Sequence, residues 1–562
     1  MGGDVRPDRH WVRRDVSSVP PQGGYVAKQC PVRAQNDALY PDAERTPVGA
    51  FLQSLFDQGN AFEDRIFETL EASGALRITE RSRDARIAAT MRAAADRVAV
   101  ILGGELPIDP VNRRAGRPDV LVAARGGGYR AVDVKSGGVL GHARSAIPAL
   151  LSSLDAPAYE DASVDPARCA KTNRKNLLQL AHYQRMLEAA GIAATDGRFG
   201  AIIGREAVVA WMDLDSDVFR SPSSTGLTKR RSTMEVYDFE FGFRLDIIAT
   251  THAHLRDPSV ELLVRPVRVP ECDGCPWEAH CLAELTVGDG DLSLLPGIGF
   301  KQWKKHRERG VTTRAELAAL TPDDPRYADA EMRDLADQIE QARAWMSPEP
   351  FTLRRGIRTL DLPRGDIEID VDLENAPDGR VYLWGALRAD GTTTSYHPFV
   401  TWEPLTPERE AANFVAFWSW LCDERAQAAA AGKTLRAYFF SPIETRYMRA
   451  LGEAAGVRDE VDAFVSSDAW LDLHRIVERQ VVTGTSLSLK VLAPLAGFAW
   501  EVDDPGGAVS MLQYVTAVDQ EAPGAQRARE WLLAYNRNDV EATAAVRAAL
   551  DGLARRGDTG RT

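Results

Sequence analysis

The chain has 562 residues, of which 44% are hydrophobic and 27% are charged. This composition is typical of a folded globular protein and excludes wholesale disorder, and the length exceeds what one hydrophobic core supports. The formal net charge of −13 argues against nucleic acid as a partner, unless positive charge is concentrated locally or metal ions intervene. Six cysteines exclude a disulfide scaffold, no apolar run reaches the about 20 residues that span a bilayer, and the polar N-terminus lacks the apolar stretch of a secretory signal. We therefore expect a cytoplasmic protein that does not enter a membrane.

The chain pattern predicts three folded parts between two tails. Residues 25–285 mix helical and strand patterns and contain five of the six cysteines. Residues 286–350 are expected to form short helices, and residues 355–550 begin with strands and continue as alternating helices and strands. Residues 1–24 and 551–562 are expected to be tails.

A predicted helix near the start of the first part carries a carboxylate at the edge of its apolar face. The stripe at helical spacing consists of Phe62, Ile66, Phe67 and Leu70. Glu63 lies beside this stripe, where a carboxylate that faces inward needs a partner such as a metal ion. The alternative is a glutamate that reaches water.

Two strand-like runs on either side of a glycine-rich turn predict a β-hairpin. In the second run, Asp133 and Lys135 share one face because side chains alternate along a strand. A turn centred near Gly126 or Gly127 places Asp119 opposite Asp133 or Lys135. Two carboxylates and an ammonium then converge, an arrangement that suits Mg²⁺, water and a phosphate. A surface hairpin with a cross-strand ion pair is the alternative.

A helix predicted over residues 176–186 places Gln179 and Tyr183 on one face, because the two residues are four apart. There the amide and the phenol could reach a phosphate, a base edge or a metal-bound water. Ordinary helix polarity is the alternative.

The ordered set of these residues resembles the PD-(D/E)xK nucleases of the RecB group. Pro118-Asp119 corresponds to the PD, Asp133-x-Lys135 to the (D/E)xK, and Gln179-x3-Tyr183 to the downstream motif of that group. One departure is Phe62, where many relatives carry a histidine next to the helix glutamate, so one metal contact is missing. The resemblance implies a restriction-endonuclease-like α/β fold with metal contacts at Glu63, Asp119 and Asp133 and with catalytic residues Glu63, Asp119, Asp133, Lys135, Gln179 and Tyr183.

Three cysteines lie in the dense pattern Cys272-x2-Cys275-x5-Cys281, and four-coordinate binding needs a fourth thiolate, for which Cys30 is the candidate. One cysteine before the nuclease part and three after it resemble the iron–sulfur staple of AddB-type and CRISPR-associated RecB-like nucleases. The resemblance implies a [4Fe–4S] cluster on Cys30, Cys272, Cys275 and Cys281. A structural Zn²⁺ site, with His280 replacing one cysteine, is the alternative. Cys169 and Cys422 have no partners by spacing and are expected to be free thiols.

The segment 294–310 opens with Leu-Pro-Gly-Ile-Gly before a basic helix, which resembles the helix-hairpin-helix motif. In that motif, glycine amides at a helix N-terminus bind a phosphate backbone without reading sequence. A plain helical connector with a solvated basic face is the alternative. Further positive runs at 171–175 and 229–231 could supply a local field for DNA. The candidate nucleic-acid contacts are Gly297, Gly299, Lys301, Lys304, Lys305, Lys229, Arg230 and Arg231.

The run Ile367–Glu374 alternates strictly between apolar and acidic residues, so a strand here puts four carboxylates on one face. Their mutual repulsion costs stability unless cations are present. Residues 437–444 predict a later strand that ends in Glu444. A helix near the C-terminus places Tyr535 and Asp539 on one face.

These features resemble the RNase H-like 3′–5′ exonucleases of the DEDD type. The first motif corresponds to Asp372-x-Glu374 or Asp370-x-Asp372, and Tyr535-x3-Asp539 corresponds to the last motif of the tyrosine subclass. The family holds two Mg²⁺ ions on such acids, and its tyrosine orients the attacking water. The middle motif departs from the pattern. The family has an aspartate after a strand at this place, and the best candidates here are Glu444 and, later in the chain, Asp472. The implied catalytic residues are Asp372, Glu374, Tyr535 and Asp539, and the implied metal ligands are Asp370, Asp372, Glu374, Glu444 and Asp539.

The order of the parts resembles a bacterial family of RecB-like nucleases over nearly the whole chain. We expect an iron–sulfur PD-(D/E)xK nuclease domain and an RNase H-like domain joined by a helix-hairpin-helix-like segment. The resemblance implies a DNase that uses Mg²⁺ or Mn²⁺ and serves DNA repair or recombination. Its expected substrates are single-stranded DNA or DNA ends, and exonuclease action is expected rather than endonuclease action. No Walker A loop is present, so a helicase motor or other repair protein would be a separate partner. A non-catalytic nucleic-acid-binding scaffold and an RNase are the alternatives.

Overall fold

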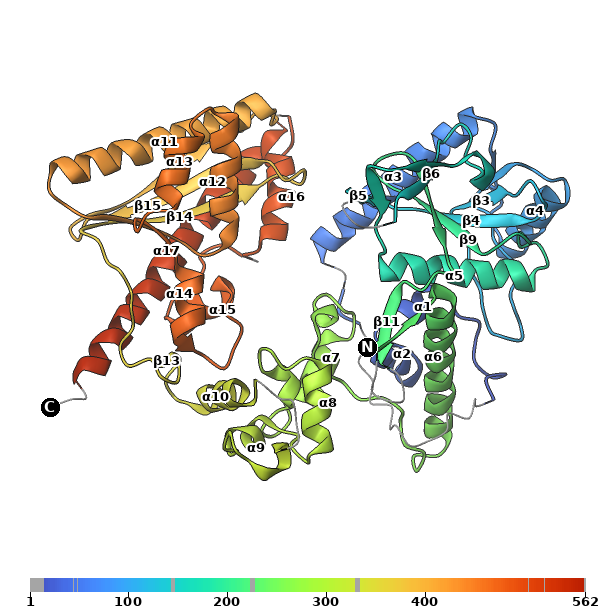
Figure 1. Ribbon diagram of the computed structural model, residues 1–562, viewed down its shortest axis with the longest axis horizontal. Helices are drawn as coiled ribbons and strands as arrows, with labels where there is room; N and C mark the ends of the chain where they lie inside the picture. The colour runs from blue at the N-terminus through green and yellow to red at the C-terminus, as the bar shows by residue number, and fades with distance from the viewer. Residues whose placement is uncertain are drawn as a thin grey trace. The chain divides into compact units, whose positions relative to one another are not determined.

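The structure is a computed structural model that describes residues 15–43, 45–47, 49–142, 147–222, 228–328, 334–503, 505–519 and 521–559. It divides into an N-terminal unit, Met1–Glu284, and a C-terminal unit, Leu285–Thr562. Both units mix helices and strands (Figure 1). Residues 1–14 and 560–562 of the expected tails lie outside the described residues.

The N-terminal unit is built on an eight-stranded sheet in the order β1-β2-β3-β4-β9-β10-β6-β7. The pairs β1–β2 and β4–β9 are parallel, and the other neighbours are antiparallel. Two small ribbons pair β5 with β8 and β11 with β12. The strands are β1 Leu76–Arg77, β2 Val100–Leu102, β3 Val120–Ala123, β4 Tyr129–Val134, β5 Leu140–His142, β6 Ala149–Ser152, β7 Ser163–Asp165, β8 Arg168–Ala170, β9 Phe199–Ile203, β10 Val209–Asp213, β11 Phe219–Pro222 and β12 Thr228–Arg231.

Helices cover this sheet and bury its apolar residues. Helix α5 contacts β4 and β9, and α6 contacts α1, α2 and α5. Ile66, Phe67 and Leu70 of α3 pack against valines of β3 and β4, as their helical spacing predicts. The helical segments are α1 Tyr25–Lys28, α2 Pro31–Leu39, α3 Ala50–Ala72, α4 Arg83–Ala95, η1 Tyr159–Asp161, α5 Arg174–Ala189, α6 Thr233–Arg256, η2 Pro270–Cys272 and α7 Glu278–Leu285.

Two features of this unit bear directly on the sequence-based expectations. The glycine-rich turn joins β3 to β4 with Val120 opposite Val132, and continuing this register by one residue places Asp119 opposite Asp133. The expected N-terminal tail is partly packed, because Val19 is fully buried and Gln22 forms a β-bridge with Arg114.

The C-terminal unit begins with short helical segments that pack around a buried histidine. The ring nitrogens of His306 lie 2.6 Å from the Tyr327 hydroxyl and 2.9 Å from Gln338 Oε1, which ties three of these segments together. The segments are η3 Leu292–Leu294, α8 Phe300–Glu308, α9 Arg314–Ala318, η4 Pro325–Tyr327 and α10 Leu335–Met346.

A five-stranded sheet follows in the order β16-β15-β14-β17-β18. The first three strands are antiparallel, and β17 and β18 run parallel to β14. A separate short ribbon pairs β13 with β19. The strands are β13 Thr352–Leu353, β14 Ile367–Asn375, β15 Val381–Ala389, β16 Thr394–Val400, β17 Leu435–Phe439, β18 Trp470–Asp472 and β19 Val481–Val482.

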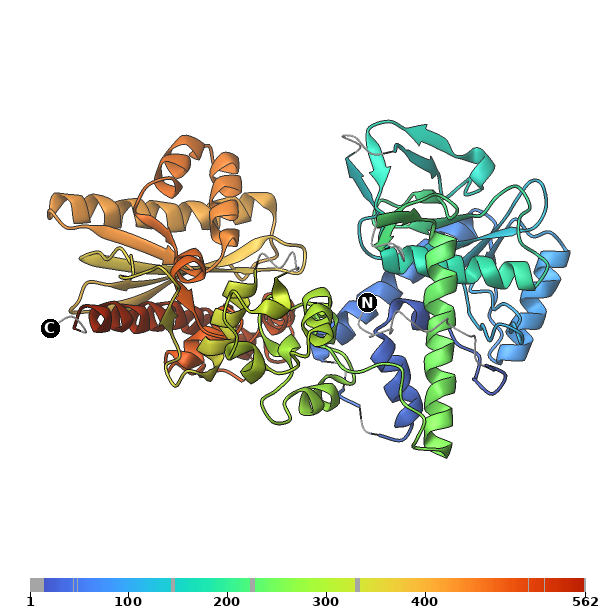
Figure 2. The ribbon, with the colours of Figure 1, turned by 60° about the horizontal axis from the view of Figure 1, so that its bottom comes forward.

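Helices lie on both faces of this sheet (Figure 2). The apolar residues of β14 pack with α11, α12 and α13, whereas the acidic residues of β14 face α16 and α17. Helix α17 continues through Thr559, so most of the expected C-terminal tail is helical. The helices are α11 Pro407–Ala430, α12 Pro442–Ala454, α13 Arg458–Val465, α14 Leu473–Gln480, α15 Leu489–Leu495, α16 Gly507–Val518 and α17 Ala525–Thr559.

Among the described residues, no helix combines the length and the apolar character that crossing a bilayer requires.

Candidate functional site

The four carboxylates on one face of β14 fall into two pairs with different partners. Arg547 of α17 donates to Glu368 and, at 2.5 Å, to Asp370 Oδ2. Arg364 forms two further hydrogen bonds with Glu368, at 2.5 and 2.8 Å. These guanidinium groups outweigh burial and lower the pKa of Glu368 to about 2. Asp370, expected as a metal ligand, is therefore engaged in a buried ion pair instead.

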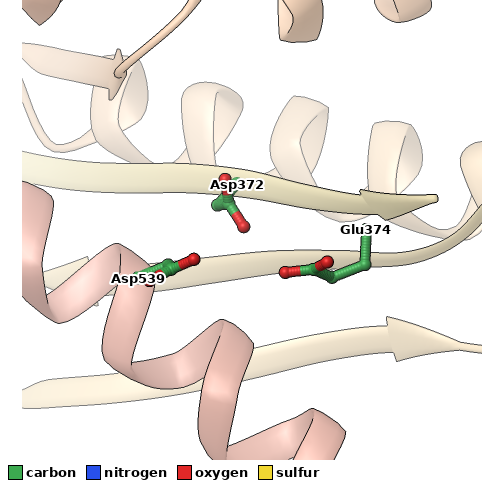
Figure 3. Close-up of side chains that lie close together, drawn as sticks. All are labelled: Asp372, Glu374 and Asp539. Carbon is green, nitrogen blue, oxygen red and sulfur yellow. The ribbon is translucent and has the colours of Figure 1, made fainter. Parts of the chain in front are cut away.

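The other pair meets a third carboxylate to form an acidic triad (Figure 3). Asp372 and Glu374 of β14 and Asp539 of α17 each offer one oxygen, and these oxygens lie within 4.8 Å of one another. Burial raises the pKa of Asp372 well above its ordinary value and that of Glu374 to about 8, and repulsion by the neighbouring carboxylates adds to both shifts. Such a group needs a cation, and oxygen ligands at this spacing suit Mg²⁺ or Mn²⁺.

Two polar side chains hold the strand carboxylates in place. Asn536 Nδ2 donates to Asp372 Oδ2 at 2.8 Å, and the Tyr396 hydroxyl donates to Asn536 Oδ1 at 2.8 Å. The Ser510 hydroxyl donates to Glu374 Oε2 at 2.7 Å. Sequence reasoning missed Asn536 and Ser510. Asn536 could have been found from its place directly after Tyr535, whereas Ser510 carries no local signal.

Asp539 lies among basic and aromatic side chains. Its Oδ1 atom accepts hydrogen bonds from Lys490 Nζ at 2.5 Å and from Trp500 Nε1 at 2.6 Å. Tyr535, four residues earlier on α17, is 3% exposed, and burial together with the triad carboxylates raises its pKa, so its hydroxyl stays neutral. Lys490 and Trp500 were also missed, because they come from α15 and the loop after it.

Glu444 lies near the triad without being one of its three members. The expected strand ends at Phe439, because Ser441 caps α12 and Pro442 begins it. Glu444 in the first helical turn is buried and accepts a hydrogen bond from the Ser441 hydroxyl at 2.8 Å. Burial raises its pKa to about 7, and its charge also raises the pKa of Asp372. The other candidate, Asp472, caps α14 by accepting from Arg475 N at 2.9 Å.

The comparison with known families bears on this unit. Residues 366–551 match the sequence model of the RNase H superfamily. This part of the chain is an RNase H-like domain. RNase H-like domains are commonly metal-dependent nucleases that use Mg²⁺ or Mn²⁺, and the acidic triad lies on β14 and α17 of this domain. No curated protein and no solved structure matches the chain.

The N-terminal unit brings its predicted acidic residues and lysine together. Lys135 Nζ lies 2.6 Å from Asp133 Oδ2, and Asp119 Oδ2 accepts from Val134 N at 2.7 Å. Burial raises the pKa of Asp119 well above its ordinary value, and repulsion by Asp133 and Glu63 adds to the shift. Burial also raises the pKa of Glu63, against the opposing charges of Lys135 and Arg117. Glu63, Asp119, Asp133 and Lys135 therefore interact as one electrostatic group.

The two α5 residues predicted to act at this site, Gln179 and Tyr183, are hydrogen-bonded to each other. Gln179 Nε2 donates to the Tyr183 hydroxyl at 2.5 Å, and this hydroxyl donates to Arg117 O at 2.9 Å.

Sequence reasoning missed Lys28 of α1, whose ammonium interacts with Asp133, Asp119 and Lys135. Burial lowers the pKa of Lys28 to about 8. Its signal was weak, because α1 has only four residues.

The four cysteines proposed as ligands are free thiols in one neighbourhood. Cys30 N donates to Glu271 Oε1 at 3.1 Å, which ties the start of α2 to the 270–281 segment. Burial and the nearby thiols of Cys30, Cys275 and Cys272 raise the pKa of Cys281 to about 12. Zinc–sulfur bonds of about 2.3 Å would bring sulfurs to about 4 Å of each other. In the described chain, the acidic triad is the only group of three or more His, Cys, Asp or Glu side chains whose ligand atoms lie within 4.8 Å of one another. The cysteines therefore show no assembled cluster.

The remaining cysteines and the alternative zinc ligand have other neighbours. Cys169 donates to His142 O at 3.5 Å, and Cys422 is a free thiol in α11. The ring of His280 lies tilted against Tyr40 and edge-on to Trp277, with centroids 4.7 and 5.7 Å away.

The predicted nucleic-acid contacts lie at two places. Gly297 has a φ of +78°, which favours glycine, and Gly299 caps the N-terminus of α8, which carries Lys301, Lys304 and Lys305. Lys304 Nζ lies 3.8 Å from Glu308. In the β11–β12 ribbon, Lys229 and Arg230 are exposed, and Arg231 Nε donates to the Ser221 hydroxyl at 2.8 Å.

Proposed function

We propose that the chain is a metal-dependent DNA nuclease that acts on single-stranded DNA or DNA ends in the cytoplasm, as an exonuclease, in repair or recombination. The observation that carries the proposal is the convergence of Asp372, Glu374 and Asp539 in an RNase H-like domain. Within the described ranges, an arginine pairs with the neighbouring acids Glu368 and Asp370 of β14, and none pairs with these three. Phosphodiester hydrolysis at such a centre needs divalent ions, which these carboxylates would hold.

The residues around the triad have distinct roles in this reaction. A bound Mg²⁺ or Mn²⁺ would polarise the phosphate and lower the pKa of a bound water. The hydrogen bonds from Asn536 and Ser510 keep the carboxylates of Asp372 and Glu374 oriented toward the ion. The neutral Tyr535 hydroxyl next to Asp539 can donate to the attacking water and orient it.

Degradation assays on the full chain test this function. Labelled single-stranded DNA, duplex DNA and RNA are incubated with Mg²⁺, Mn²⁺ or EDTA. We expect metal-dependent shortening of DNA from an end, and Asp539→Asn should remove the part of this activity that the triad performs. The matched control is Asp423→Asn, an exposed acid on α11. Degradation of RNA alone would identify an RNase, and binding without cleavage under every metal would identify a scaffold.

The N-terminal unit supports a second nuclease site of the PD-(D/E)xK kind. The observation that favours it is the electrostatic group of Glu63, Asp119, Asp133 and Lys135. Two carboxylates and a lysine can hold a metal ion and offset charge in the transition state. The double substitution Asp133→Ala with Lys135→Ala should remove the part of the DNase activity that survives in Asp539→Asn. No effect of the double substitution on that remainder would reject this second site.

We propose that Cys30, Cys272, Cys275 and Cys281 bind a [4Fe–4S] cluster. Four free thiols from two segments that share a hydrogen bond provide the donor set of such a cluster. Anaerobic purification should give a brown protein with absorbance near roughly 400 nm, and Cys275→Ser should lose the colour while Cys169→Ser keeps it. A colourless protein with one bound Zn²⁺ would favour the zinc alternative.

We also propose that α8 and the β11–β12 ribbon contact the DNA backbone. Exposed lysines and arginines bind phosphate and release counterions, so binding weakens as salt rises. Replacing Lys229 and Arg230 by Gln should weaken binding and reduce the salt dependence, whereas Asp423→Asn should change neither.

A helicase or other repair protein would act as a separate partner, which co-purification with the full chain can test.

A further inference from the structure

Lys490 lies at the acidic triad of the RNase H-like domain although it comes from another part of the chain. Its Nζ atom is 2.5 Å from Asp539 Oδ1, and the same oxygen accepts the Trp500 indole N–H at 2.6 Å. Both acceptor directions of this oxygen are therefore in use.

Aromatic rings fix the position of the ammonium. Lys490 Nζ lies 4.2 Å from the centroid of the Trp500 ring and 4.4 Å from that of the Tyr535 ring. A cation near two ring faces gains cation–π stabilisation in addition to its ion pair. The Lys490 side chain is 35% exposed, so it is only partly enclosed by the domain.

The charge of Lys490 acts on more than Asp539. It opposes the rise in the pKa of both Asp372 and Glu374, so the ammonium interacts with all three triad carboxylates. Lys490 thus supplies positive charge next to the place where a divalent ion would bind. An ion that uses Asp539 Oδ1 must displace the ammonium from that oxygen, and an ion on the other oxygen still meets its repulsion.

We propose that Lys490 is a positioning residue that competes with the divalent ion for the triad. In the metal-free protein it keeps the three carboxylates assembled, and it releases Asp539 when the ion binds. This inference rests on the proposed metal centre and adds an internal competitor to it. The competition makes the metal affinity of the centre weaker than the carboxylates alone would give, so the centre fills fully only when metal is abundant.

Mn²⁺ titrations of the full chain, by calorimetry or by the paramagnetic resonance of free Mn²⁺, test the proposal without measuring cleavage. Asp539→Asn identifies the binding that belongs to the triad. For that component we expect Lys490→Met to bind Mn²⁺ at least about tenfold more tightly than the wild type, because a unit charge at ion-pair distance is removed. Lys490→Arg, which keeps the charge, should stay within about threefold of the wild type. The matched control is Lys433→Met, an exposed lysine of the same unit.

Each outcome has a defined meaning. Equal Mn²⁺ affinity of Lys490→Met and the wild type overturns the competition, even if the variant is less stable. If Asp539→Asn binds Mn²⁺ as the wild type does, the proposed metal centre itself is overturned. Lys490→Gln serves as the second neutral variant if Lys490→Met does not fold, and it should also bind Mn²⁺ more tightly than the wild type.

Discussion

The carboxamide of Asn536 fills the space that a side chain at position 385 would need. A Cβ atom added to Gly385 would lie 1.6 Å from Asn536 Oδ1, far inside van der Waals contact. Gly385 of β15 is paired with Asp372 of β14. The missing side chain therefore lets Asn536 of α17 reach across β15 and hold Asp372.

Replacing Gly385 by Ala should damage the metal centre through this contact. Either Asn536 leaves Asp372 or the helix moves, and overpacking of this kind typically costs about 1–3 kcal/mol. We expect a lower free energy of unfolding and weaker Mn²⁺ binding, measured by chemical denaturation and by titration.

The matched control is Gly552→Ala on α17, the helix that carries Asn536, since a Cβ at position 552 meets no atom within 4 Å. Alanine should leave that variant as stable as the wild type or slightly more stable. A Gly385→Ala protein with wild-type stability and Mn²⁺ affinity would contradict the role of Asn536.

Among the described arginines of the C-terminal unit, Arg547 should be the most costly to remove. Its side chain is buried and pairs with both Glu368 and Asp370, so Arg547→Met leaves two buried carboxylates without that partner. Breaking a buried pair in this way typically costs about 3–5 kcal/mol. Denaturant unfolding monitored by circular dichroism measures this loss.

The control for Arg547→Met is Arg355→Met, an exposed residue whose loss should cost little. Combining Arg547→Met with Glu368→Gln and Asp370→Asn removes the unpaired charges and should recover part of the stability. A cost of less than about 1 kcal/mol for Arg547→Met alone would show that the carboxylates do not depend on this guanidinium.

The alternation at Ile367–Glu374 was enough to predict a strand with its acids on one face, and the structure confirms it. The sequence could not show which acids bind a metal, because Arg547 lies 177 residues from Asp370. Lys490 and Trp500 escaped notice for the same reason, since their contact with Asp539 spans 49 and 39 residues. Periodicity reports which face a residue occupies, whereas the partner on that face is decided by tertiary packing.

In the N-terminal unit, the local signals were also the reliable ones. The glycine turn predicted the β3–β4 hairpin and one of two registers, and the observed register places Asp119 opposite Asp133. The partners of the Tyr183 hydroxyl could not be predicted, because it accepts from Gln179 Nε2 and donates to Arg117 O. That backbone carbonyl becomes a partner only when the loop before β3 folds against α5.

In the presence of EDTA, the RNase H-like domain should lose stability as pH rises. The pKa of Glu374 is raised to about 8 and that of Glu444 to about 7, from an ordinary value of 4.5. Between these values the folded protein binds more protons than the unfolded chain, so the free energy of unfolding falls from about pH 4.5 to about pH 8. A thermal melt should therefore move down by a few degrees, about 3 °C or more, across this window.

Two comparisons test the origin of this pH dependence. Glu374→Gln should flatten the slope in EDTA, because its amide does not titrate in this range. Saturating Mn²⁺ should reverse the slope, since the ion binds the ionised carboxylates and competes with protons. An unchanged slope in Glu374→Gln would contradict the assignment to this carboxyl group.

Anomalous X-ray scattering from crystals soaked in Mn²⁺ tests the central claim most directly. We predict a manganese peak within coordination distance of Asp372, Glu374 and Asp539, with Lys490 moved away from Asp539 Oδ1, and no such peak in Asp372→Asn. A saturated crystal without manganese at these three carboxylates, and with the Lys490–Asp539 ion pair intact, would contradict the account.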